Sequence, residues 1–327
     1  MEYIKFGYAK NVSVTVLVDN MASLIVKSND FVHYFVEQPL LAEHGFAALV
    51  SLNDLGVNVL WDGGFSQLAL LENMKRMKIA PKIINKIALS HGHNDHTGAI
   101  TEILRAISIL PEPQTWEANF TMKEFLTLAD EAHIPIIAHP AVFRERWEIQ
   151  EDGVKAGPYS PPSRAEWEAA GGRMVLSTDP LQLYEGCWTT GAIPQDHKKN
   201  SRKSSGAFYR EGAELIPDDI DDDQSLIINI KDKGLVILSG CAHSGIVKTV
   251  RYAQEISGVK KIHAVLGGFH LANRSSDEIE QTASELRNIN PDFIIPSHCT
   301  GINALSRFFD QFPQEFICGV VGATYLF

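Results

Sequence analysis

The sequence predicts a layered α/β fold with polar side chains gathered at one edge of its sheets. In the last third of the chain, short apolar runs typical of strands alternate with segments whose apolar residues recur at helical spacing. The strongest polar clusters directly follow such runs, and clefts in α/β proteins open at the carboxyl ends of strands. With 45% hydrophobic residues in 327, the chain can bury a substantial core.

Composition and charge exclude several classes of function. The formal net charge of −11 argues against nucleic acid or an anionic membrane surface as the main partner. No run of about 18 apolar residues predicts a membrane span, and residues 1–20 lack the basic and apolar pattern of a signal peptide. Four cysteines do not make a disulfide framework in a chain this long. We therefore expect a cytoplasmic protein that acts on a small molecule, with its oligomeric state left open.

The first part of the chain is mostly strand. Val12–Val18 places four valines on one face at period two, and the polar pair Asp19-Asn20 ends it. Short apolar runs also predict strands at Phe46–Leu52, Val57–Trp61 and Lys86–Ser90. Apolar residues at helical spacing predict a helix over Gln67–Met77.

The rest of the chain completes one predicted domain, 1–327. A less regular insertion spans roughly 110–215, with a strand at Ile134–Ala138, a Gly- and Pro-rich loop at Gly153–Pro162 and a polar, basic loop at His197–Ser205. Beyond it, we predict strands at Ser225–Ile230, Leu235–Leu238, Ile262–Leu266 and Phe293–Ile295, and helices at Ile246–Ile256 and Asp277–Ile289.

The sharpest chemical signal is His91-Gly92-His93-Asn94-Asp95-His96, directly after a predicted strand. Imidazole and carboxylate groups are ligands that Zn²⁺ and Fe bind. Side chains alternate along an extended segment, so His91 and His93 point the same way and can hold one metal. Asp95 and His96 follow where the chain must turn into a helix, predicted to start near Thr97, and they can reach a second metal.

Three other polar clusters also follow predicted strands. They are Ser239–His243, Gly267–His270 and Pro296–Gly301. Because strand ends share an edge of the sheet, we expect all these clusters to converge on one rim.

These segments resemble the metallo-β-lactamase superfamily. His91–His96 is similar to its HxHxDH signature, and Asp62-Gly63-Gly64 resembles a turn at the end of one of its strands. Blocks at 43–45, 139–140, 190–194, 222–226, 240–245, 267–271 and 296–301 resemble one branch. Its members are named metal-dependent hydrolases or, in some cases, 7,8-dihydropterin-6-methyl-4-(β-D-ribofuranosyl)aminobenzene-5′-phosphate synthase of the methanopterin pathway. The resemblance implies a four-layer αββα sandwich that holds one or two metals between two sheets.

The resemblance also assigns roles to residues. It implies that His91 and His93 belong to a first metal site, that Asp95 and His96 belong to a second, and that His298 is the final histidine of the second site. Asp95 has an expected catalytic role as well. Where the second site is empty, it would orient or deprotonate the attacking water.

Two standard ligands of the superfamily are missing. An acidic run, Asp218–Asp223, stands where the third histidine is usual, and Ser239-Gly240 leads to a cysteine where the bridging aspartate is usual. The candidates to replace them are Cys241 as a thiolate, His243, His270, and Asp222 or Asp223. Alternatives stay open: Cys241 as a small buried residue, His243 beside the metal without binding it, and His270 as a catalytic residue that binds substrate or donates a proton.

Substrate contacts are predicted further from the signature. The candidates are His44, which could touch substrate, and His139 with Arg144 and Arg146 nearby, which could bind an anionic group such as phosphate. The loop His197–Ser205 could close over an anionic substrate or be an uninvolved surface. Gln195 stands where the branch commonly has an arginine.

We therefore expect a hydrolase with one or two divalent metal ions, zinc first and iron or manganese as alternatives, acting on a small, anionic, phosphoester or pterin-like substrate. One alternative is a synthase that joins a pterin to a ribofuranosyl-aminobenzene phosphate. Another is a non-catalytic metal or ligand sensor, suggested by the two missing ligands.

Overall fold

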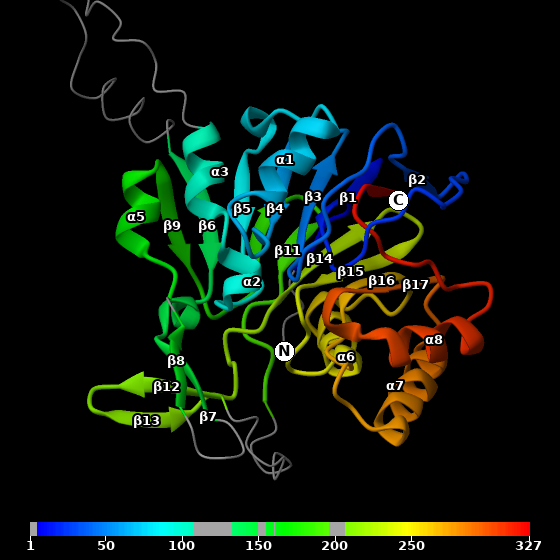
Figure 1. Ribbon diagram of the computed structural model, residues 1–327. Coiled ribbons are helices and arrows are strands. Elements are labelled where there is room, and N and C mark those ends of the chain that lie inside the picture. Colours follow the sequence, from blue (N-terminus) through cyan, green and yellow to red (C-terminus); the bar gives the residue numbers. More distant parts are fainter. Residues whose placement is uncertain (1–4, 108–132, 150–154, 160, 196–206) are drawn as a thin grey trace, which may run out of the picture.

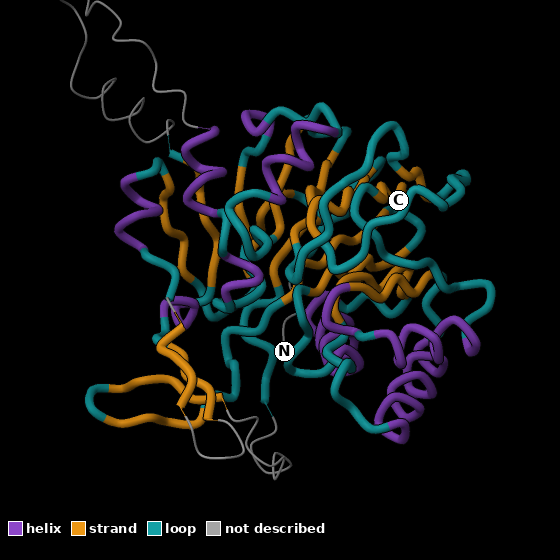
Figure 2. Tube along the Cα trace, in the orientation of Figure 1, coloured by secondary structure: helices purple, strands orange, loops and turns teal. Residues whose placement is uncertain are grey.

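The computed structural model describes residues 5–107, 133–149, 155–159, 161–195 and 207–327. Within these residues, the strands form an eight-stranded sheet, a six-stranded sheet and a small four-stranded sheet. The two large sheets lie face to face, and helices cover the outer face of each (Figure 1; Figure 2). This is the predicted four-layer αββα order.

The eight-stranded sheet has the order β2-β18-β1-β3-β4-β5-β6-β9. Its strands are β1 (Val12–Val18), β2 (Val32–Tyr34), β3 (Ala47–Leu52), β4 (Val57–Trp61), β5 (Lys86–Ala88), β6 (Ile134–Ala138), β9 (Gly172–Leu176) and β18 (Ala323–Leu326). From β4 to β9 the neighbours run parallel, so their carboxyl ends lie at the same edge. At the other side, β18 brings the end of the described chain beside β1.

The six-stranded sheet has the order β10-β11-β14-β15-β16-β17. Its strands are β10 (Leu181–Tyr184), β11 (Cys187–Thr189), β14 (Ser225–Ile230), β15 (Gly234–Ser239), β16 (Ile262–Gly268) and β17 (Phe293–Ser297). Because β15, β16 and β17 are parallel, the three polar clusters that follow them come to one edge.

Three apolar cores hold the layers together. The first lies between the sheets and includes Val14, Trp61 and Leu238. The second joins the eight-stranded sheet to α1 (Ala69–Arg76), α3 (Ile100–Ile107) and α5 (Arg164–Ala169), and the third joins the six-stranded sheet to α6 (Ile246–Ser257), α7 (Ser276–Ile289) and α8 (Ile302–Gln311). Short elements complete the described structure: α2 (Asn94–Thr97), η1 (Pro81–Ile83), η2 (Pro140–Phe143) and η3 (His298–Thr300).

The predicted strands and helices are confirmed with two exceptions. The helix expected near Thr97 begins at Asn94, with His93 as its extended N-cap residue, so Asp95 and His96 lie inside helix α2 rather than before it. The early start is supported by His93, whose carbonyl accepts the His96 N–H at 3.0 Å and the Thr97 hydroxyl at 3.1 Å. None of the helices among the described residues is both long and apolar enough to span a membrane.

The second exception is the predicted loop Gly153–Pro162, part of which is strand. The four-stranded sheet has the order β13-β12-β7-β8, and it projects from the sandwich (Figure 1). Its strands are β7 (Arg146–Ile149), β8 (Lys155–Tyr159), β12 (Ala207–Glu211) and β13 (Glu214–Pro217). β8 is an edge strand, which tolerates glycine and proline because one side forms no ladder. The loop His197–Ser205 lies outside the described residues, and the prediction of one domain stays a prediction.

The core between the sheets predicts the effect of a truncation. Leu238 is fully buried there, so Leu238→Ala should lower the free energy of unfolding by about 2–5 kcal/mol. Leu55→Ala, at a half-exposed turn position, should change it by no more than about 0.5 kcal/mol. Denaturant titration in the presence of a chelator measures both. Equal effects of the two substitutions would contradict the proposed packing.

Candidate metal centre

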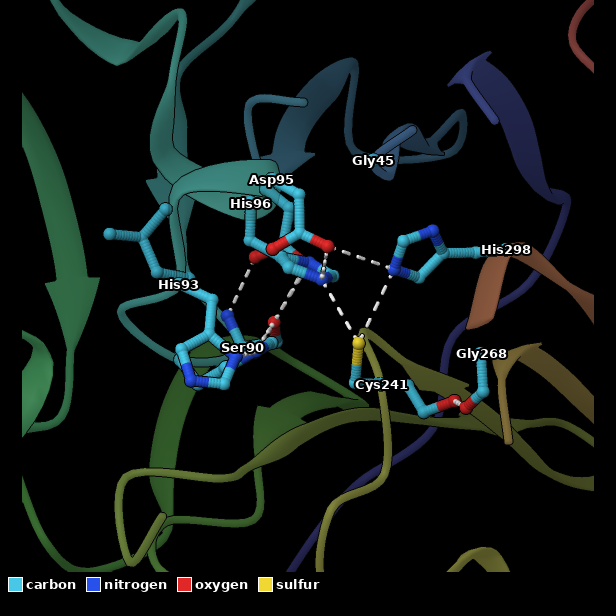
Figure 3. Close-up of polar contacts among 12 residues, drawn as sticks. Gly45, Ser90, His93, Asp95, His96, Cys241, Gly268 and His298 are labelled. Atoms are coloured by element: carbon cyan, nitrogen blue, oxygen red, sulfur yellow. Dashed lines mark hydrogen bonds and ion pairs between the residues drawn. The ribbon is translucent and has the colours of Figure 1, made fainter. Parts of the chain in front are cut away.

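The predicted site residues meet at the shared edge of the two large sheets. His91 and His93 lie between β5 and α2, and Asp95 and His96 lie on α2. From the other sheet, Cys241 and His243 follow β15, His270 follows β16 and His298 follows β17. The expected convergence of strand ends is therefore what the structure has, and Figure 3 shows side chains of both sheets pointing toward one another.

The first ligand group consists of three histidines. The Nε2 atom of His91 lies 3.0 Å from His93 Nδ1 and 3.2 Å from His243 Nε2. Burial, together with neighbouring histidines, holds the pKa values of His91 and His243 well below the usual range. Burial and the nearby Arg146 lower the pKa of His93 to about 4. All three rings are therefore neutral near pH 7, which is the form that binds metal.

The second group combines a carboxylate, two histidines and a thiol. His96 Nε2 lies 3.2 Å from Cys241 Sγ, which lies 3.3 Å from His298 Nε2 (Figure 3). Asp95 Oδ2 lies 3.3 Å from His298 Nε2 and 3.7 Å from His96 Nε2. His96, Cys241 and His298 are buried, whereas Asp95 is partly exposed.

These separations suit a tetrahedral metal ion. With metal–nitrogen bonds of about 2.0–2.1 Å, neighbouring nitrogen ligands lie about 3.3 Å apart, and a sulfur ligand lengthens this edge to about 3.6 Å. The observed contacts of 3.0–3.7 Å within the two groups are close to these values. The donor sets, three imidazoles in one group and imidazole, carboxylate and thiol in the other, are also those that zinc binds.

Charge in the second group is balanced between Asp95 and the histidines. Burial alone would raise the pKa of Asp95, but His96 and hydrogen bonds from His298 and His44 together hold it far below its usual range. Burial opposes protonation of His96, yet Asp95 and Asp62 raise its pKa to about 9. Burial raises the pKa of the Cys241 thiol. Binding of a cation would release the protons of His96 and Cys241, because metal ligands must be deprotonated.

Buried partners fix which nitrogen of each ring faces the groups. His96 Nδ1 donates to Asp62 Oδ2 at 2.8 Å, and His298 Nδ1 donates to the side-chain oxygen of Asn20 at 2.9 Å. Ser90 Oγ donates to Asp62 Oδ2, so it accepts from His91 Nδ1 at 2.8 Å. In all three histidines, Nε2 is left for a metal. The sequence prediction missed Asp62, Ser90 and Asn20 as partners, although all three also lie at strand ends.

His270 extends the site beyond these two groups. Cys241, His243 and His270 form a third, overlapping set with ligand atoms within 4.8 Å of one another. The rings of His243 and His270 lie 4.2 Å apart, and His270 Nδ1 is buried with no hydrogen-bond partner. Among the candidates, His270 therefore has a ring nitrogen available for proton transfer or for a ligand.

The turns that present these side chains adopt strained backbone conformations. Ala242, His270 and His298, one after each of β15, β16 and β17, have φ values of 55°, 52° and 49°. Residues other than glycine occupy this left-handed region at an energetic cost, and such residues cluster at functional sites.

The acidic run contains two candidates for the missing ligands. Asp222 and Asp223 lie outside the three groups, so the groups give no support to the prediction that one of them replaces a ligand, which stays a prediction. Asp222 accepts the Gly92 N–H at 2.8 Å, and Asp223 accepts the Ser244 N–H at 2.8 Å. One oxygen of each carboxylate therefore accepts from the backbone of a ligand-bearing loop. The other oxygen of Asp222 accepts from Arg146, and Asp223 Oδ1 is buried without a hydrogen-bond partner.

The predicted substrate residues have different surroundings. His44 Nε2 lies 3.3 Å from Asp95 Oδ2, and 65% of its side chain is exposed, so it lies at the rim of the second group. His139 Nδ1 accepts the Ala141 N–H, and Arg144 forms ion pairs with Asp218 and Asp221. These contacts use His139 Nδ1 and the Arg144 guanidinium within the protein, and the predicted anion-binding role stays a prediction.

Comparison with known proteins agrees with this geometry. A model of the metallo-beta-lactamase superfamily matches residues 43–298. The chain is 33% identical to the 7,8-dihydropterin-6-methyl-4-(beta-D-ribofuranosyl)-aminobenzene-5′-phosphate synthase of Methanocaldococcus jannaschii over 91% of this chain and 94% of that protein. An uncharacterized protein of the same organism is 26% identical over 92% and 98% of the two chains. A crystal structure described as a metal-dependent hydrolase of the beta-lactamase superfamily superposes with a TM-score of 0.68, at 23% identity, over 96% of this chain and 98% of that one.

The geometry of the second group predicts a spectroscopic signature for Cys241. When Co²⁺ is added to metal-free protein, we expect a near-ultraviolet absorption band from charge transfer between a thiolate and cobalt. Cys241→Ala should abolish this band, because Cys241 is the thiol in the ligand groups. Cys187→Ala, a buried cysteine in the core between the sheets, should leave it intact. A band that survives in Cys241→Ala would remove Cys241 from the metal centre.

Proposed function

Because the chain belongs to the metallo-β-lactamase superfamily, we propose that it is a metal-dependent hydrolase that acts on a small, anionic, phosphoester or pterin-like substrate. The observation that carries this proposal is the pair of ligand groups at the shared edge of the sheets. We propose zinc as the metal, since the thiol of Cys241 suits zinc better than manganese; iron is an alternative.

The two groups differ in charge, which supports an anionic substrate. His91, His93 and His243 are neutral ligands, so a divalent cation there keeps its full positive charge. In the second group, the Asp95 carboxylate and the thiolate that Cys241 forms on losing its proton together neutralise the charge of a divalent cation. A bound cation of this kind lowers the pKa of a water molecule and polarises the bond to be broken. An anionic substrate group is therefore attracted most strongly to the first group.

The residues at the rim have proposed roles in handling substrate and protons. Asp95 either binds in the second group or, where that position holds no cation, orients or deprotonates the attacking water. His44 lies beside Asp95 and is exposed, so it is placed to contact substrate. His270 has an unpartnered Nδ1 beside His243, which supports a role in protonating the leaving group.

A second candidate function is a synthase that joins a pterin to a ribofuranosyl-aminobenzene phosphate. The 33% identity to the Methanocaldococcus jannaschii synthase over nearly the whole of both chains favours it. The same residues would then bind the anionic leaving group instead of activating water. A sensor without catalysis has less support, because the thiol and imidazole of Cys241 and His243 stand beside the remaining candidate ligands, and we propose that they replace the two missing ones.

The proposed setting is the cytoplasm, with a small molecule as the partner. The four cysteines are free thiols, as is usual in a reducing compartment.

A substrate panel tests the reaction class. We expect the zinc-loaded protein to hydrolyse phosphodiesters in preference to lactones and thioesters, since the first group favours a negatively charged substrate. The same preparation is then incubated with the two substrates of the synthase reaction, a dihydropterin diphosphate and the ribofuranosyl-aminobenzene phosphate. The products are identified by mass spectrometry. Formation of the joined product without hydrolysis of the other substrates would establish the synthase function. If the metal-bound protein turns over none of these substrates, only the sensor function would remain.

Substitution of His270 tests proton transfer. His270→Ala should lower kcat by on the order of 10²–10⁴-fold while leaving the metal content unchanged, because its ring nitrogen acts on the substrate. His33→Ala removes an exposed histidine on β2 and serves as the control. Loss of bound metal in His270→Ala would show instead that His270 is a ligand.

A further inference from the structure

Residues 222–224 form a buried segment, just before β14, that contacts loops of both sheets. Asp222, Asp223 and Gln224 are at most 2% exposed. Gln224 forms two hydrogen bonds with the residues directly after β5. Its backbone N–H donates to the Ser90 carbonyl at 3.0 Å, and its side-chain amide donates to the Leu89 carbonyl at 2.8 Å. The segment is thereby anchored next to both ligand groups.

Asp222 supports the backbone between His91 and His93. One of its carboxylate oxygens accepts the Gly92 N–H at 2.8 Å, and the other accepts from Arg146 Nη2 at 2.6 Å. Arg146 is itself buried and donates to Asp218 at 2.8 Å. A Cβ on Gly92 would lie 2.2 Å from the Val142 carbonyl oxygen and 2.5 Å from Arg146 Nη1. The Gly92 backbone is therefore held closely against this ion pair.

Asp223 supports the loop after β15 in the same way. Its carboxylate accepts the Ser244 N–H at 2.8 Å, and Ser244 Oγ accepts from the Gln195 side chain at 2.6 Å. Ser244 directly follows His243 and lies three residues after Cys241. A single carboxylate therefore holds the loop that contributes to both ligand groups.

We infer that the 222–224 segment positions both ligand groups, with Asp222 acting through Gly92 on His91 and His93, and Asp223 acting through Ser244 on His243 and Cys241. The inference rests on the metal-binding role proposed above. Hydrogen bonds from backbone N–H groups to ionised carboxylates are short and strong in a buried setting. Loss of such supporting partners typically weakens metal binding by about 10- to 100-fold.

Titration of the metal-free protein with Co²⁺ separates the two groups. One binding step should show the thiolate charge-transfer band and report the Cys241 group, and the other should show only visible bands and report the three histidines. Asp222→Asn should weaken the histidine step by about 10- to 100-fold and change the thiolate step little. Asp223→Asn should weaken both steps, because Ser244 lies in the loop that carries both Cys241 and His243. Asp219→Asn removes the same charge at an exposed position of the acidic run and should titrate like the wild type.

The outcomes distinguish the positioning role from the metal centre itself. If the wild type binds both cobalt ions and both folded variants titrate like it, the positioning role is wrong and the metal centre stands. If the wild type binds no cobalt, both are wrong. Where Asp222→Asn does not fold, Arg146→Lys replaces it: this variant keeps Asp222 and one charged donor, so the histidine step should weaken by a smaller factor. An unchanged histidine step in Arg146→Lys would overturn the role of Asp222.

Discussion

The packing of five buried or partly buried histidines side by side is the constraint on which the rest of this site depends. His91, His93, His96, His243 and His298 all belong to groups whose ligand atoms lie within 4.8 Å of one another. Protonated rings at this spacing would repel one another in a low-dielectric interior. The protein avoids this in two ways. It holds the rings of the first group neutral by burial, and it places carboxylates beside the others.

The fold supplies this arrangement by bringing strand ends of two sheets close together. The two halves approach closely at Gly240, since a Cβ there would lie 2.1 Å from Ser90 Oγ and 2.9 Å from Asp62 Oδ2. Ser90 and Asp62 orient histidines of the first sheet, and Gly240 directly precedes the thiol ligand of the second. The absence of a side chain at position 240 therefore lets the two halves of the ligand set meet.

Much of the fold could be predicted from the sequence, because buried strands are marked by continuous or alternating apolar runs. Val12–Val18, Val57–Trp61, Ile134–Ala138 and Ser225–Ile230 are strands with the predicted bounds. The convergence of the candidate ligands that follow strands could be predicted for the same reason. The edge strand β8 was missed because its glycine and proline are typical of loops, and its pairing with β7 is a tertiary contact.

The supporting carboxylates could not be assigned from the sequence. Asp222 can bind a cation or accept a backbone N–H, and only the position of Gly92 across the fold decides between them. Arg144 likewise has the charge to bind phosphate, but the nearby Asp218 and Asp221 already pair with it. Charged residues in irregular segments therefore keep several interpretations until their partners are known.

Anomalous X-ray scattering from zinc-soaked crystals tests the central claim most directly. We expect one peak within bonding distance of the nitrogens of His91, His93 and His243, and a second beside Asp95, His96, Cys241 and His298. Peaks elsewhere on the molecule, with these side chains hydrogen-bonded only to one another, would contradict it.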